Sequence, residues 1–330
     1  MKTSKIYCFL FVIVSTGTLF SCKKNTTGNN NPSSTTDLQT NSDDETRVST
    51  ETDAAFDDVN TAMTAQFNVT GAATGREMQQ RVLDGPGGGV DSGLICDGTI
   101  TIDTASNPHT ITITYNGNNC SLNRTRSGNV VISWPAGQLW RTAGAVVTVQ
   151  FNALAITRVS DNKSITLNGT HTYTDVSGGS LISLPNNPGT SITHTITSSN
   201  MSITFDNGAK RTWNVARQRV FTYDKGYVVT STGTQSQGSL SGISEWGTDR
   251  FGMTFQVAIV EPLVISQSCS WQMTAGQAAL SNSVGTTTIT YGLSSTGVST
   301  GCPIGDATYY FQLSWTAAAS GKTYTFILPY

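Results

Sequence analysis

His109-Thr-Ile-Thr-Ile-Thr-Tyr115 alternates apolar and hydroxyl-bearing side chains over the length of a whole strand. In an extended chain successive side chains point to opposite faces, so the two isoleucines and Tyr115 share one face. The same period of two occurs in further short stretches broken by Asn, Gly and Pro: Thr99–Asp103, Val130–Trp134 and Val146–Phe151. The pattern predicts an all-β body over residues 84–330, made of antiparallel meanders in packed, sandwich-like sheets.

Two blocks of the chain, about 94–155 and 265–330, repeat one arrangement around such a strand. Each has a cysteine, a threonine-rich strand, a second cysteine and a tryptophan: Cys96, His109–Tyr115, Cys120 and Trp134 in the first, and Cys269, Thr286–Tyr291, Cys302 and Trp315 in the second. We interpret the blocks as divergent copies of one cysteine-stapled meander.

Antiparallel hairpins explain the spacing of the cysteines in the first block. If Asp103 faces His109 across the turn, Cys96 lies opposite residue 116. Cys120 is then close enough for a disulfide.

The second block gives the same result when Leu280 faces Thr286, because Cys269 then comes within reach of Cys302. An even number of cysteines in an exported chain favours disulfides. A zinc site is the alternative, but these cysteines have neither C-x₂-C spacing nor adjacent histidines. We therefore expect one disulfide within each block.

The first 22 residues have the organisation of a lipoprotein signal peptide. Lys2 and Lys5 form a basic region, residues 6–14 form an apolar region too short to span a bilayer, and Leu19-Phe20-Ser21-Cys22 is a lipobox. The lipobox predicts cleavage after residue 21 and acylation of Cys22. At about 0.8 kcal/mol per buried methylene, two or three acyl chains hold a protein on a membrane. An ordinary secretory signal, the alternative, leaves the cysteine unexplained.

The residues after the lipobox divide into a tether and a helical segment. Residues 22–49 are polar and contain no aromatic residue, so we expect a flexible tether. Phe56, Val59, Met63 and Phe67 recur at helical spacing, and Thr50-x-x-Asp53 resembles a capping box. We expect one amphipathic helix over 50–67, packed on the β body, within a segment 50–83 that leads to a glycine-rich loop.

Composition excludes some classes of function. Cleavage after residue 21 removes Lys2 and Lys5, so 19 basic residues become 17 against 21 acidic ones, a formal charge of −4. This balance argues against a nucleic-acid partner, which favours a basic face. The loop Asp84–Gly93 is a single, unrepeated glycine-rich segment, which is weak support for calcium. We expect no metal and no cofactor.

Several segments resemble a family of uncharacterised Bacteroidota lipoproteins. They are Thr110–Cys120, Asn123–Ile132, Gly144–Phe151, Arg211–Arg219 and Ser268–Trp271, and the resemblance covers roughly residues 90–330. It implies a secreted, lipid-anchored, β-rich protein and no particular activity. Surface-displayed lipoproteins of that phylum often carry an acidic export signal after the acylated cysteine. Lys23-Lys24-Asn25 departs from that pattern, so the periplasmic side and the cell surface both stay open.

Residues suited to catalysis are sparse. The chain has three histidines: His109, His171 and His194. All three fall in or beside threonine-rich strand patterns without a G-x-S-x-G motif, so we expect hydrogen-bonded strand histidines. The acids that a glycoside hydrolase would use are Glu245, Asp249 and Glu261, of which the first two flank Trp246 in an expected loop. Acids in loops are commonly only solvated, so we expect no catalytic residue.

Two tryptophans and two arginine pairs are candidates for binding. Trp140 and Trp246 fall in expected connections, where an exposed indole can stack on a sugar or plug the end of a β core. Two arginine pairs, Arg124 with Arg126 and Arg217 with Arg219, are spaced i, i+2 and so point to one side of a strand. They suit an acidic ligand, but salt bridges across the sheet are the simpler expectation.

The sequence thus predicts a lipid-anchored protein of the outer membrane with a binding or structural role. Its expected partners are the membrane, through the lipid on Cys22, and either a glycan or another envelope protein. The alternative is a glycan-binding accessory protein or a carbohydrate-active enzyme.

Overall fold

The computed structural model describes residues 44, 47, 48, 51, 52, 54, 55, 58, 59, 62 and 63, and ranges 95–269, 272–302 and 309–329. From Gly98 onward, the described strands form a single antiparallel sheet. Strands make up 63% and helical segments 8% of these residues, so the all-β prediction is confirmed. The expected packing of separate sheets is wrong. Consecutive hairpins hydrogen-bond without a break from the first described strand to the last, which leaves one 15-stranded sheet.

The strands are β1 (Gly98–Asp103), β2 (His109–Asn118), β3 (Arg124–Trp134), β4 (Ala145–Arg158), β5 (Ser164–Asp175), β6 (Ile192–Phe205), β7 (Lys210–Tyr223), β8 (Tyr227–Gly233), β9 (Gln235–Gln237), β10 (Leu240–Thr248), β11 (Thr254–Ser266), β12 (Gln272–Asn282), β13 (Gly285–Leu293), β14 (Tyr310–Ala317) and β15 (Thr323–Pro329). Two short 3₁₀ helices, η1 (Leu181–Asn186) and η2 (Gln267–Cys269), lie between strands.

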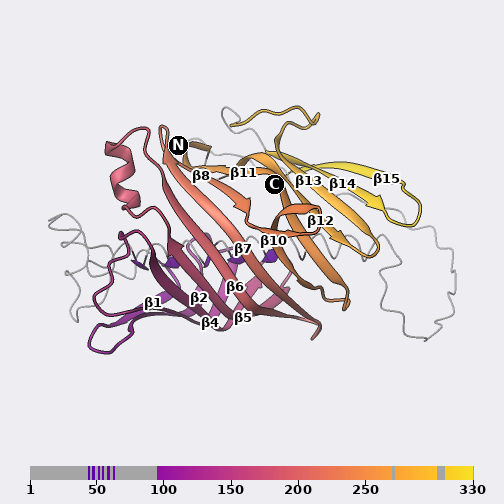
Figure 1. Cartoon of the computed structure of the whole chain (residues 1–330). Helices are drawn as coiled ribbons and strands as arrows, with labels where there is room; N and C mark the ends of the chain where they lie inside the picture. Colours follow the sequence, from indigo (N-terminus) through magenta and orange to yellow (C-terminus); the bar gives the residue numbers. More distant parts are fainter. Residues whose placement is uncertain are drawn as a thin grey trace, which may run out of the picture. The chain divides into compact units, whose positions relative to one another are not determined.

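Sheet order follows chain order except between β7 and β11 (Figure 1). There β8 and β10 lie end to end, because each pairs with a different part of both neighbouring strands. Gly233 and Gly242 allow two backbone segments to approach each other closely at this point. A Cβ atom on Gly233 would lie 2.0 Å from the carbonyl oxygen of Gly242, so a larger residue does not fit.

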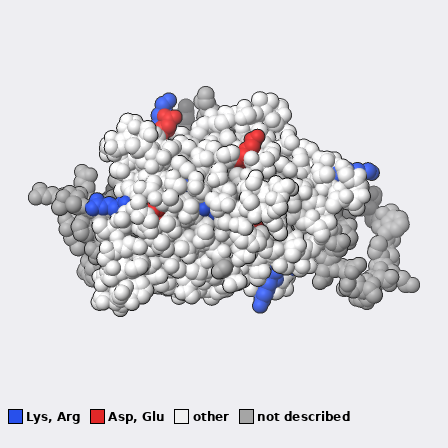
Figure 2. Space-filling model, in the orientation of Figure 1, with Lys and Arg blue, Asp and Glu red and all other residues white. Residues whose placement is uncertain are grey.

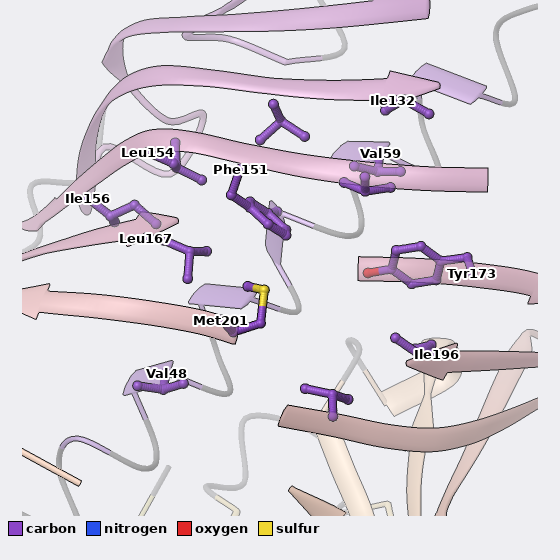
Figure 3. Close-up of a cluster of buried hydrophobic side chains, with 14 of the residues drawn as sticks. Val48, Val59, Ile132, Phe151, Leu154, Ile156, Leu167, Tyr173, Ile196 and Met201 are labelled. Carbon is purple, nitrogen blue, oxygen red and sulfur yellow. The ribbon is translucent and has the colours of Figure 1, made fainter. Parts of the chain in front are cut away.

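One face of the sheet carries the hydrophobic core. Ile111, Phe151 and Trp213 are buried on it, as the period-two pattern of their strands predicts. Val48 and Val59, from the segment before the sheet, belong to the same cluster, and Figure 3 shows their side chains among those of the strands. The N-terminal segment therefore contributes to the core.

The predicted helix over 50–67 remains a prediction. No helix of seven or more consecutive residues occurs in the described part of the chain. The described positions from 44 to 63 have helical backbone, but they are separated by residues outside the description. Within the same ranges, no helix is long and apolar enough to cross a membrane. Cys22, residues 23–43 of the expected tether and the glycine-rich loop 84–93 lie outside the described residues. The expected tether 22–49 is wrong at its end, because Asp44, Arg47 and Val48 are buried against the sheet.

The structure contains the two local disulfides that the hairpin argument favours, Cys96–Cys120 and Cys269–Cys302. The expected registers are each wrong by one residue. Asp103 lies opposite Thr110 rather than His109. In the second block Leu280 lies opposite Thr287 rather than Thr286. The observed register differs from the assumed one by one residue in each hairpin, and the cysteines still meet because they lie outside the paired residues of the two hairpins.

Candidate functional site

Many of the charged side chains lie on the core face of the sheet rather than on its surface. The buried ones include Arg126, Asp175, Arg211, Arg219, Glu245 and Asp249. Figure 2 accordingly shows a surface with few charged groups on the face that it presents. Several charged groups of the described residues are therefore held in internal ion pairs, and the face shown in Figure 2 offers mainly uncharged groups for binding.

The densest ion cluster joins the N-terminal segment to the first strands. Arg126, on β3, donates two hydrogen bonds to Asp97, at 2.7 and 2.6 Å, and a third to Asp58, at 2.6 Å. The Tyr115 hydroxyl also donates to Asp58, at 3.0 Å, and the guanidinium lies 4.4 Å from the centre of the Tyr115 ring. Burial, partly offset by Arg126, raises the pKa of Asp58. This cluster holds the chain before the sheet against β2 and β3.

Two further ion pairs act in the same way at other positions of that segment. Arg124 pairs with Glu51, and Arg250 pairs with Asp44. Their partners are 73 and 206 residues away in the sequence. Acids of the N-terminal segment thus face arginines of the sheet at three places.

Strand β7 places three arginines on the core face. Arg211 and Arg217 both pair with Glu245 of β10, which is itself buried. Arg219 lies two residues after Arg217 on the same strand. The i, i+2 spacing therefore puts Arg217 and Arg219 on one side of the strand, and Arg217 forms a salt bridge across the sheet, as expected.

A row of buried polar residues crosses β5 to β8, formed by Asp175, His194, Arg219 and Ser231. Each lies directly opposite the next in the strand register. His194 Nε2 is 3.9 Å from Asp175 Oδ1, and Gly178 N–H donates to the same oxygen. Within the described residues, Asp175 Oδ2 and His194 Nδ1 have no hydrogen-bond partner.

Burial controls the protonation of this pair. It raises the pKa of Asp175 to about 6, despite hydrogen bonds from Gly178 and Ser177. Burial, together with the charge of Arg219, lowers the pKa of His194 to about 4. At neutral pH the row therefore holds a neutral imidazole beside a carboxylate. Since both groups are almost fully inaccessible to solvent, a structural role fits them better than chemistry on a ligand.

Trp140 lies in the connection between β3 and β4, as predicted, and it packs against this row. Its indole meets the His194 ring edge-on, with centroids 5.0 Å apart, and also contacts the main core. The connection is fixed to the end of β5, because Gly144 N–H donates to the Asp175 carbonyl. Trp140 is half-buried and closes the end of the core.

Trp246 does not lie in a connection, contrary to the prediction. It lies within β10, opposite Asn214 and Gln256. Because its neighbour Glu245 points to the core, Trp246 points to the other face of the sheet. The two candidate indoles therefore do not border one groove. The strand continues here because Gly247 leaves room for Trp213 opposite it: a Cβ on this glycine would lie 2.6 Å from the Trp213 Cα atom.

The candidate acids are also not arranged for glycoside hydrolysis. Glu245 is neutralised by two arginines, and Asp249 is buried and accepts hydrogen bonds from Phe251 N–H and Met253 N–H. Glu261 is exposed on β11. The described residues contain no group of three or more His, Cys, Asp or Glu side chains that could hold a metal ion.

The most accessible candidate surface lies at the C-terminal end of the sheet. We call it the open apolar face, and it consists of Tyr291, Phe311, Leu313, Trp315, Tyr324, Phe326 and Leu328. Strand register puts these residues on the side of the sheet that carries the core, where Thr287 and Ile289 of β13 are still buried. Burial decreases outward from there, and Tyr324, Phe326 and Leu328 are 48%, 54% and 42% exposed.

Sequence reasoning did not identify this surface. Its signal is the alternation of large apolar residues in Phe311–Trp315 and Tyr324–Leu328, joined by a short turn. The same alternation occurs in strands whose apolar face is covered. Only the sheet order shows that β15 is the last strand and that its face is exposed.

We expect Trp140→Ala to destabilise the fold, because the indole fills the end of the core. The free energy of unfolding should fall by about 2–3 kcal/mol, somewhat less than for a fully buried tryptophan. Trp246→Ala, on the other face, is the matched control and should cost about 1 kcal/mol or less. Urea denaturation followed by fluorescence measures both. An unchanged midpoint for Trp140→Ala, together with loss of binding to a glycan array, would instead favour a sugar-stacking role.

Comparisons with known proteins give no relative: no family model, no curated protein and no solved structure matches the chain.

Proposed function

We propose that this protein is a lipid-anchored component of the outer membrane that binds a partner through the open apolar face. The anchor rests on the lipobox at Leu19–Cys22, and the two disulfides suit an exported protein. The binding role rests on one observation, the exposure of Tyr324, Phe326 and Leu328 side by side on one strand. Contiguous apolar patches of this kind mark interaction sites, because leaving them in water is unfavourable.

The glycan-binding and carbohydrate-active alternatives have less support. Stacking on a sugar needs exposed rings on one surface, whereas Trp140 and Trp246 are half-buried on different faces. Hydrolysis needs two accessible carboxylates, and Glu245 and Asp249 are buried. The open apolar face does contain aromatic rings, but it has no charged or carboxamide group among its members to orient a sugar.

The proposal includes an amphipathic helix over 50–67 as the element that closes the other end of the core. Val59, Ala62 and Met63 are buried at intervals of three and one, and Glu51 and Asp58 make ion pairs with the sheet. These intervals fit one face of a helix. The helix would cover the core at the end where the first strands lie, whereas the apolar residues of the last strand, β15, are exposed.

We expect Cys22→Ala to release the protein from the membrane, because acylation needs the cysteine sulfur. The measurement is the share of protein in the membrane fraction after cell lysis, with mass spectrometry of the N-terminal peptide. Wild-type protein should sediment with outer membranes and carry a lipid-modified peptide, and the variant should do neither. Ser21→Ala is the matched control, because it keeps a small residue before the cysteine and should leave acylation intact. Membrane retention of Cys22→Ala without any lipid would contradict the proposal.

A further inference from the structure

The last strand of the sheet, β15, combines the open apolar face with an unpaired edge. Among the described strands it pairs only with β14, so one row of its backbone N–H and C=O groups faces outward. Its seven residues, Thr323-Tyr-Thr-Phe-Ile-Leu-Pro329, contain no charged side chain. Natural proteins usually protect such an edge with charges, bulges or proline. Here Lys322 precedes the strand and Pro329 ends it, and among the described residues no charge or bulge protects the centre.

The combination limits the chemistry of the partner. A bilayer could cover the apolar side chains but would leave the strand-edge N–H and C=O groups without hydrogen bonds, which is costly in hydrocarbon. A small apolar ligand leaves the same groups unpaired. An extended polypeptide satisfies both needs, because it adds a strand and brings its own apolar side chains. The partner is therefore a β-strand without charge at its centre.

We propose that the partner is a second copy of this chain, paired through β15 in antiparallel orientation about a two-fold axis at Phe326. In this register Phe326 lies opposite its own copy, and Tyr324 lies opposite Leu328. All three apolar residues then meet apolar residues, and the whole strand is used, with Thr323 opposite Pro329. Proline, which has no N–H to donate, lies at the end of the pairing, where the loss is smallest. No like charges meet across the axis, and the arrangement closes as a dimer.

The contact is small, so the inferred dimer rests on the proposed lipid anchor to become well populated. Seven residues a side compares with roughly 20–30 in stable interfaces, which predicts a weak dimer in dilute solution. Tethering both copies to one membrane raises their effective concentration without any new contact. We therefore expect mostly dimer on membranes and a concentration-dependent mixture for the soluble Cys22→Ala protein.

Single-cysteine variants of the mature, acylated protein in phospholipid vesicles test the register. Directly opposite residues of an antiparallel pair have Cα atoms about 4.5–5.5 Å apart, within disulfide range. Phe326→Cys should form a covalent dimer under mild oxidation with copper phenanthroline. Tyr324→Cys alone should react poorly, because its two copies lie about 13 Å apart along the strands. A mixture of Tyr324→Cys and Leu328→Cys proteins should cross-link efficiently. Val159→Cys, which is 47% exposed in the turn between β4 and β5, measures random collision.

A second variant tests the contact without a covalent bond. Phe326→Glu places two like charges at the axis and should lower the dimer fraction of the Cys22→Ala protein at least tenfold in sedimentation velocity. Val159→Glu should leave it unchanged, and circular dichroism checks that both variants fold.

Cross-linking of Phe326→Cys no greater than that of Val159→Cys would overturn the proposal. Preferential 324–324 linkage, or capture of a different envelope protein by Phe326→Cys in cells, would also overturn it. A failure of the lipid anchor would appear separately, as an unacylated Cys22 peptide.

Discussion

Replacing Arg126 by methionine should destabilise the protein by about 3–5 kcal/mol, the range expected when one partner of a buried ion pair is removed. Arg126 is the partner of two acids, and the Asp97 side chain is fully buried, with 0% exposure. The variant leaves both carboxylates in the core without their cation, although Tyr115 still donates to Asp58. Urea denaturation at pH 7 measures the loss. The loss should shrink at acidic pH, because burial raises the pKa of Asp58 and this carboxyl group can then take up a proton.

Arg158→Met is the matched control for this substitution. Arg158 also donates two hydrogen bonds to one aspartate, Asp161, but that pair lies at the surface. Exposed ion pairs contribute little, so the control should change the unfolding midpoint only slightly. Adding Asp97→Asn to Arg126→Met should restore part of the lost stability, since the buried group is then neutral. If Arg126→Met and Arg158→Met lowered the free energy of unfolding equally, the view that Arg126 holds the N-terminal segment on the sheet would be refuted.

Local features of the sequence were sufficient to predict the strands and the two disulfides. The alternation in His109–Tyr115 predicts a buried face, and Ile111 and Ile113 are buried. The spacing of the cysteines brings Cys96 to Cys120 within one hairpin, even though the assumed register was wrong by one residue. These inferences depend on residues close in sequence, where few arrangements of the chain are possible.

Features that depend on distant parts of the chain could not be predicted. Alternation of apolar and polar residues shows that a strand has a covered face, but it does not show what covers that face. A single sheet covered by an N-terminal segment therefore gives the same sequence pattern as two packed sheets. Trp246 lies outside the alternating stretches of the sequence, so a connection was the expectation for it. Its strand pairing depends on Trp213, 33 positions earlier, which needs the space at Gly247. The partner of Glu245, Arg211, is likewise 34 residues away. No local rule identifies such partners.

The open apolar face is the clearest case of this limit. Tyr324, Phe326 and Leu328 alternate in the same way as buried residues in other strands, so the sequence predicts burial for them. Their exposure follows from the position of β15 at the end of the sheet. The open apolar face is therefore recognised from the order of the strands in the sheet. The positions of Trp140 and Trp246, which the sequence favoured, are instead decided by core packing and by strand pairing.

The stability of the wild-type protein should change little between pH 6.5 and 4 through the Asp175–His194 pair, because the two pKa shifts have opposite effects. The pKa of Asp175 is raised to about 6 from 3.8, so its burial as a carboxylate is unfavourable above pH 6 and is relieved as the pH falls towards 4. The pKa of His194 is lowered to about 4 from 6.5, so the unfolded chain takes up this proton first and stability is lost as the pH falls through the same window. Each effect is roughly 2–3 kcal/mol.

Single substitutions should make each half of this balance visible. Asp175→Asn leaves only the histidine effect, so its free energy of unfolding should fall by about 3 kcal/mol, relative to wild type, between pH 6.5 and 4. His194→Gln leaves only the aspartate effect, and its stability should rise by about 2–3 kcal/mol over the same interval. Urea denaturation at half-unit steps of pH measures both, and subtracting the wild-type curve removes the contribution of all other acids. Arg219 remains in each variant, so its charge is constant. Parallel curves for the two variants would show that the buried row does not titrate in this window.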